Sequence, residues 1–282
     1  MSPLNPLSPL IVCYARGGGL GHLTRLRAVL HTLGWGGEVT VLSGSPFAAD
    51  ARIAGGWRVL APSDPVRTLA ELEPDELIVD AFPAGLKGEL TAVPAGTRVT
   101  HLARLLRWDA YLPLLPAVPP RFDRTFVLEP LDPAHGSYLR SVSDEIAPLD
   151  LTDPPSAPID VDGWLIVHGG PDAEIRELVA YARDMAALEG VRPPMTLVSP
   201  RRPDGLPAGI AHRDAYPACP PGPRVERIVT AAGFNAVRQF APWRDRHRML
   251  PFPRALDDQF TRAKRARDPA LGSTSRFRST SR

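Results

Sequence analysis

Short aliphatic runs alternate with segments of helical periodicity along the first half of the chain. The run at residues 11–15 predicts a buried strand. A helix is predicted from about residue 22 to residue 33, because leucines recur there at helical spacing. Further strands are predicted at residues 39–42, 57–61, 77–80, 98–102 and 125–128. Such alternation is typical of a parallel sheet covered by helices.

The same alternation resumes after residues 146–162, whose proline- and acid-rich sequence predicts an interdomain connector. A helix is predicted at residues 172–188, and strands at residues 165–168, 195–199, 227–231 and 247–250. We therefore predict an α/β fold of two Rossmann-like, doubly wound lobes, residues 1–150 and 160–268. Residues 269–282 are rich in serine and arginine and predict a disordered tail, with a basic arm for nucleic acid as the alternative.

Charge and composition exclude several classes of function. The chain has 33 Lys and Arg against 31 Asp and Glu, so its bulk charge does not favour nucleic acid or a membrane surface as partner. Its two cysteines, Cys13 and Cys219, suit reduced thiols and show no zinc-site spacing. No export signal and no apolar stretch of about 20 residues is present. We expect a cytoplasmic protein with no transmembrane segment, for which peripheral membrane contact stays open.

A glycine-rich loop joins the first predicted strand to the first helix. Gly18, Gly19 and Gly21 permit positive φ and close approach of a ligand to the backbone, and a helix start favours anions. A dinucleotide fingerprint does not fit, because His22 occupies the position of its third glycine and Ser43 that of its acidic residue. A P-loop does not fit either, since no Gly-Lys-Ser/Thr follows. A plain tight turn remains the alternative.

His22 lies in the first turn of that predicted helix. The helix dipole disfavours a charged imidazole there, which suits a general base. A structural histidine is the alternative.

Two further glycine turns join strands to helices in the second half of the chain. Gly169 and Gly170 form the first, and Gly233, Phe234 and Asn235 form the second. Backbone amides at such turns can bind a phosphate or diphosphate, with a plain turn as the alternative.

Asp257, Asp258 and Gln259 follow the last predicted strand. Carboxylate and amide groups suit the hydroxyls of a sugar or ribose. An Asp that caps the following helix is the alternative for at least one of the two acids.

Together these motifs resemble the two-lobed GT-B glycosyltransferases, especially the bacterial group that includes the undecaprenyl-linked N-acetylglucosaminyl transferase of peptidoglycan synthesis. The resemblance covers about residues 10–267. It implies that the stretch ending at His22 is an acceptor-side loop, that residues 231–235 form the donor diphosphate turn, and that residues 257–259 with Arg262 and Ala263 contact the donor sugar.

Two departures from the family pattern follow from the same resemblance. Gln239 stands where relatives usually have a glutamate that holds the ribose. Relatives also continue with further helices after the Asp-Asp-Gln segment, so the resemblance implies a shortened C-terminal lobe.

The resemblance implies transfer of a sugar from a nucleotide-sugar, UDP-linked by preference, to an unidentified acceptor. His22 would be the catalytic base, and neither a metal nor a cofactor would be needed. A nucleotide-sugar hydrolase or epimerase of the same fold is one alternative. A non-catalytic binding protein left by loss of the C-terminal helices is the other.

Overall fold

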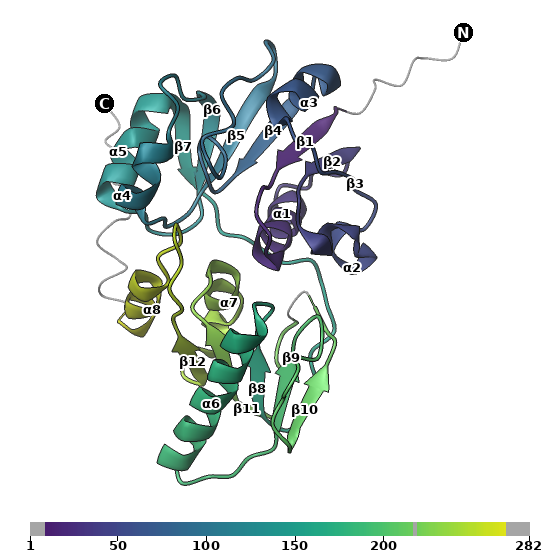
Figure 1. Cartoon of the computed structure of the whole chain (residues 1–282), viewed down its shortest axis with the longest axis vertical. Coiled ribbons are helices and arrows are strands. Elements are labelled where there is room, and N and C mark those ends of the chain that lie inside the picture. The colour runs from purple at the N-terminus through teal and green to yellow at the C-terminus, as the bar shows by residue number, and fades with distance from the viewer. Residues whose placement is uncertain (1–8, 217–218, 269–282) are drawn as a thin grey trace. The chain divides into compact units, whose positions relative to one another are not determined.

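Two compact units make up the chain in the computed structural model, which describes residues 9–216 and 219–268 (Figure 1). The first unit, here the N-lobe, ends at Asp153, and the second, the C-lobe, begins at Pro154. Each unit is built on one parallel sheet with helices packed against it. The predicted α/β class with two Rossmann-like, doubly wound lobes is confirmed.

The N-lobe sheet has seven strands in the order β3-β2-β1-β4-β5-β6-β7. All neighbouring strands pair in parallel. The strands are β1 (Ile11–Tyr14), β2 (Val39–Leu42), β3 (Arg58–Leu60), β4 (Glu76–Asp80), β5 (Arg98–Ala103), β6 (Phe122–Val127) and β7 (Ser143–Pro148). Since the order reverses beside β1, the carboxyl ends of β1 and β4 form the switch point at which such sheets bind ligands.

The N-lobe helices begin at clear sequence signals. Asp64 and Asp132 cap α3 and α5 with their side chains, and each is followed by a proline in the first turn. The helices are α1 (Leu20–Thr32), α2 (Ala51–Ala54), α3 (Pro65–Leu72), α4 (Trp108–Tyr111) and α5 (Pro133–Val142), with short 3₁₀ segments η1 (Pro46–Ala49) and η2 (Leu112–Leu114). Leu23, Leu26 and Leu30 of α1 are buried, as their spacing predicted.

The C-lobe sheet repeats this plan with five parallel strands in the order β10-β9-β8-β11-β12. The strands are β8 (Gly163–Val167), β9 (Met195–Val198), β10 (Ile210–Arg213), β11 (Val225–Ala231) and β12 (His247–Leu250). The helices are α6 (Asp172–Leu188), α7 (Phe234–Gln239), η3 (Ala241–Trp243) and α8 (Gln259–Arg267). One face of α6, including Ile175, Leu178 and Val179, packs into the apolar core. The switch point here lies at the carboxyl ends of β8 and β11.

Some sequence predictions need correction. The prediction that the connector begins at residue 146 is wrong, because residues 146–148 complete the edge strand β7 by pairing with β6. A proline is tolerated at the end of an edge strand, so Pro148 does not interrupt the ladder. The predicted tail at 269–282 lies outside the described residues. In the described part of the chain, no helix is long and apolar enough to cross a membrane.

Candidate functional site

The switch point of the N-lobe sheet joins two segments that lie far apart in the sequence. The glycine loop follows β1 and leads into α1, which carries His22 as its third residue. The neighbouring strand β4 ends at Asp80. The topology therefore brings an imidazole and a carboxylate to the edge of the sheet where ligands bind in this fold.

His22 and Asp80 form a directly hydrogen-bonded pair. Nδ1 of His22 lies 2.5 Å from Oδ2 of Asp80. Asp80 is fully buried, whereas the His22 side chain keeps 14% of its surface exposed. An ionised Asp80 accepts a hydrogen bond from Nδ1–H of His22, which fixes the tautomer and leaves Nε2 as the proton acceptor. This is the arrangement that a general base needs.

Arg25 holds the carboxylate from the other side. Its Nε and Nη2 donate to Oδ1 and Oδ2 of Asp80, each at 2.6 Å, in a bidentate pair. Arg25 lies one turn after His22 on α1, and both side chains reach the same carboxylate from one helix. The buried charge of Asp80 is thereby paired and its position fixed.

Burial and charge set the protonation of this pair. Burial lowers the pKa of His22 below its usual value, against the hydrogen bond and charge of Asp80, which raise it; Arg25 and Arg104 lower it further. Burial alone would raise the pKa of Asp80, but the charge of Arg25 and the hydrogen bond from His22 hold it well below its usual range. At neutral pH the pair is therefore a neutral imidazole on an ionised carboxylate.

The loop glycine that His22 requires is Gly17, which the sequence did not single out. A Cβ at Gly17 would lie 2.5 Å from both Cδ2 and Nε2 of His22, whereas Gly18 and Gly19 have open space at that position. Among the described residues with positive φ, none belongs to this loop. The predicted use of positive φ is therefore wrong here. The glycine at 17 instead leaves room for the imidazole, and Gly18 and Gly19 are exposed.

Substituting Gly17 by alanine should displace the His22 ring, because Asp80 prevents the ring from moving aside without loss of the 2.5 Å bond. We expect changed imidazole ¹⁵N and ¹H shifts for His22 in G17A. The matched variants G18A and G19A add the same methyl group in open space and should leave these shifts at wild-type values. Unchanged His22 resonances in G17A would contradict this packing.

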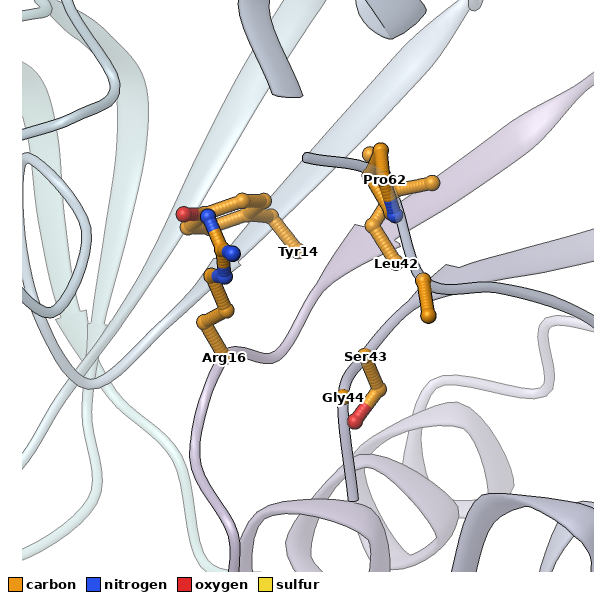
Figure 2. Close-up of a pocket in the computed structure, with 7 residues that line it drawn as sticks. Tyr14, Arg16, Leu42, Ser43, Gly44 and Pro62 are labelled. Atoms are coloured by element: carbon orange, nitrogen blue, oxygen red, sulfur yellow. The ribbon is translucent and has the colours of Figure 1, made fainter. Parts of the chain in front are cut away.

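A small pocket of about 50 Å³ lies beside the loop, at the carboxyl ends of the first three strands. Figure 2 shows Tyr14 and Arg16 on one side of it and Leu42, Ser43 and Pro62 on the other. The Tyr14 hydroxyl donates to Oε1 of Glu89 at 2.6 Å. The pocket extends the ligand-binding edge of the N-lobe away from the histidine.

The switch point of the C-lobe sheet carries a second polar cluster. Nε2 of His168, just after β8, lies 2.9 Å from Oε2 of Glu174 on α6. Arg254, in the loop after β12, pairs with both Glu174 oxygens. Partial burial opposes ionisation, but the hydrogen bonds from His168 and Arg254 lower the pKa of Glu174 to about 2. His168 also stacks on Phe252, with ring centroids 5.6 Å apart.

The predicted phosphate turn at Gly169 and Gly170 is closely packed on this cluster. A Cβ at Gly170 would collide with Nε2 of His168 and lie 3.0 Å from Oε2 of Glu174. Gly170 is thus needed for the His168–Glu174 contact itself. Gly169 is exposed.

The residues of the predicted donor-sugar segment at 257–259 make different contacts. Asp258 caps α8 by accepting from the Thr261 amide at 2.9 Å, as one alternative from the sequence foresaw. Asp257 pairs with the buried guanidinium of Arg262 at 2.8 Å. Arg262 also donates to the carbonyl of Ala232 at 3.1 Å. Gln259 is buried, and its Oε1 accepts from the Phe252 amide at 3.0 Å. These contacts join the loops after β11 and β12.

The predicted diphosphate turn follows β11 directly. Gly233 is the N-cap of α7 without a side-chain cap, and Phe234 is buried. Asn235 and Gln239 are half-buried on the same short helix. The structure therefore brings the turn at 233–235, Asp257 and the His168 cluster to one edge of the C-lobe sheet.

No group of three or more His, Cys, Asp or Glu side chains within residues 9–216 and 219–268 is arranged to hold a metal ion. The residues that sequence reasoning missed are Asp80, Arg25 and Gly17 in the N-lobe and Glu174 and Arg254 in the C-lobe. An acidic residue that ends a buried strand, as Asp80 does, was the one available signal.

No protein-family model matches the sequence, and no curated protein matches it either. Among solved structures, the chain is similar to a glycotransferase of kitacinnamycin, with 15% identity, a TM-score of 0.48 and coverage of 95% of this chain and 93% of that one. It is also similar to MurG of Acinetobacter baumannii, with 18% identity, a TM-score of 0.49 and coverage of 91% and 82%. At these identities the assignment of an activity rests on the residues of this chain.

Proposed function

We propose that this protein is a glycosyltransferase that moves a sugar from a nucleotide-sugar, UDP-linked by preference, to an acceptor hydroxyl. The observation that carries the proposal is the pair of His22 and Asp80 at the switch point of the N-lobe sheet. A neutral, partly exposed imidazole held by a buried carboxylate is suited to take a proton from a hydroxyl.

In the proposed reaction the acceptor oxygen forms a bond to the anomeric carbon of the sugar, and the bond from that carbon to the diphosphate breaks. The acceptor proton passes to Nε2 of His22. Asp80 stabilises the resulting imidazolium, and Arg25 keeps Asp80 in place through its two hydrogen bonds. The acceptor side of the reaction is thus assigned to the N-lobe.

The donor is assigned to the C-lobe by the polar edge at β8, β11 and β12. Asn235 and Asp257 are the proposed contacts to the nucleotide diphosphate and to the sugar hydroxyls, respectively. The buried Gln259 acts through the Phe252 amide that it holds. The proposal includes no metal, since backbone amides at residues 233–235 would stabilise the leaving diphosphate. A cytoplasmic location is part of the proposal, and the low cysteine content, which suits reduced thiols, supports it.

The test is a calorimetric titration with UDP and a panel of UDP-sugars, followed by product analysis with a labelled donor. Transfer to an added acceptor supports the proposal. Free sugar or an epimerised donor as the sole product would favour the hydrolase or epimerase. Binding without turnover would favour the non-catalytic alternative, and no binding of any nucleotide-sugar would refute the proposal.

Two C-lobe variants should distinguish binding of the UDP part of the donor from binding of its sugar. We expect N235A to weaken both UDP and UDP-sugar by about 10- to 150-fold, the range for a hydrogen bond to a charged ligand. D257N should weaken the UDP-sugar more than UDP, because its carboxylate is assigned to the sugar. D184N, on the exposed middle of α6, removes the same charge elsewhere and should change neither. Equal affinities of D257N and D184N for the UDP-sugar would refute the role of Asp257.

A further inference from the structure

A second polar pocket lies in the C-lobe, on the edge strand β12 and outside the donor edge described above. It has a volume of about 460 Å³. Its lining residues belong to α6, to β12 and the segment before it, and to the end of α8. Figure 1 shows α6 and α8 beside β12. The lining residues are Tyr181, Arg244, His247, Arg248, Met249, Ala266 and Arg267. Three of the seven are arginines and none is acidic, so the lining has an excess of positive charge.

The positive charge of this pocket is only partly compensated. Arg244 is half-buried and donates to the Val237 carbonyl at 2.9 Å, to Sδ of Met249 and to His247, all of them neutral. Arg267 donates to the Met249 carbonyl at 2.9 Å. Arg248 lies 3.3 Å from Glu189, but that carboxylate is shared with Arg227 at 2.8 Å. Burial lowers the pKa of Arg244 below its ordinary value.

A chain of hydrogen bonds fixes the guanidinium of Arg244. Arg244 donates to Nδ1 of His247, and Nε2 of His247 then donates to the Thr230 hydroxyl at 2.8 Å. Thr230 in turn donates to the Ala231 carbonyl at 2.7 Å. Burial, together with Arg244 and Arg248, lowers the pKa of His247 to about 3, so the ring stays neutral and can accept. Arg244 is thus positioned before any ligand arrives.

We propose that this pocket binds a phosphate group of a multiply charged ligand, through Arg244, Arg248 and Arg267. Guanidinium groups match the several acceptor oxygens of a phosphate, and a pocket of this size accepts a group larger than a single ion. The Tyr181 hydroxyl is a further donor at the same wall. Neither the acceptor nor the donor of the proposed transfer is assigned to this place.

The test is calorimetric titration of the full chain with inorganic pyrophosphate, carried out with excess UDP so that a donor diphosphate site is already filled. R248Q and R267Q should each weaken binding by about tenfold, and the double variant by about 100-fold. R183Q is the matched control for R267Q, because Arg183, like Arg267, is exposed and donates to one backbone carbonyl, that of Ala208, at 2.9 Å. It should bind as the wild type does.

A lipid phosphate is distinguished by sedimentation with phosphatidylcholine vesicles that contain or lack phosphatidic acid. Binding of pyrophosphate that R248Q/R267Q weakens by about 100-fold supports a soluble phosphate ligand. Binding only to phosphatidic acid vesicles, likewise weakened by the double variant, supports a lipid headgroup. Binding to neither probe, or equal binding by the double variant and R183Q, overturns the proposal. UDP affinity measured alone reports separately on the donor site.

Discussion

Replacing His22 with alanine is expected to lower turnover by roughly 10²- to 10⁴-fold, the usual contribution of a positioned general base, with donor affinity close to wild type. The reason is the local geometry, in which Asp80 accepts a hydrogen bond from Nδ1–H of His22 and Nε2 remains as the proton acceptor. The measurement is steady-state transfer from a UDP-sugar, together with UDP titration. H31A, at the exposed end of the same helix, is the matched control.

The D80N variant should show a loss of turnover with a distinct pH signature. Asp80 raises the pKa of His22, so its neutralisation lowers that pKa further. The imidazole then loses its proton at lower pH, and the acid limb of the kcat/KM profile moves to lower pH while its maximum falls. D144N, on the exposed edge strand β7, should retain the wild-type profile. H22A at near wild-type turnover, or D80N with an unmoved acid limb, would return His22 to a structural role.

The fold was predictable where a strand is buried along its whole length. β1, β2 and β4 are continuous buried runs, and each was expected from its aliphatic residues. β7 and β10 were missed because they are edge strands with mixed polar sequences, and the sheet order decides their pairing. The short helices α2 and α4 likewise lack a full period of apolar residues.

The candidate site was predictable only in its local parts. His22 and the glycine loop adjoin in sequence, and Asp258 carries a visible capping pattern. Asp80 lies 58 residues from His22, and their contact depends on β1 pairing with β4. Glu174 and Arg254 are 80 residues apart and meet for the same kind of reason. Sequence patterns report neighbours along the chain, whereas these pairs are fixed by the order of strands.

A buried histidine cluster in the N-lobe leads to the second large effect. His135 is fully buried and stacks on Trp108, with ring centroids 4.4 Å apart. Neither of its ring nitrogens has a hydrogen-bond partner in the described part of the chain. Burial lowers its pKa to about 3, and the nearby charges of His101 and Arg104 act in the same direction. Burial also lowers the pKa of His101 to about 4, against the Ala81 carbonyl and Asp80.

The N-lobe is therefore expected to lose stability as the pH falls below about 6.5, the ordinary pKa of histidine. Both folded pKa values are depressed, so the unfolded chain binds protons that the folded lobe does not, and acid favours unfolding. The loss runs from about pH 6.5 down to the folded pKa values of about 4 for His101 and about 3 for His135. Between its unfolded and folded pKa values, each histidine lowers the free energy of unfolding by about 1.4 kcal/mol for each unit by which the pH falls.

The variant that tests this is H135L, which removes the deeper of the two titrations and fills a similar space without a polar group. We expect H135L to be at least as stable as the wild type at pH 7, because the wild-type ring is buried without hydrogen bonds. At pH 4.5 the free energy of unfolding of H135L should exceed that of the wild type by roughly 2 to 3 kcal/mol. Amide hydrogen exchange of β5 and β6 reads the N-lobe by itself, and the exposed H31L is the control. Parallel losses in H135L and wild type between pH 7 and 4.5 would show that His135 does not carry the acid sensitivity of this lobe.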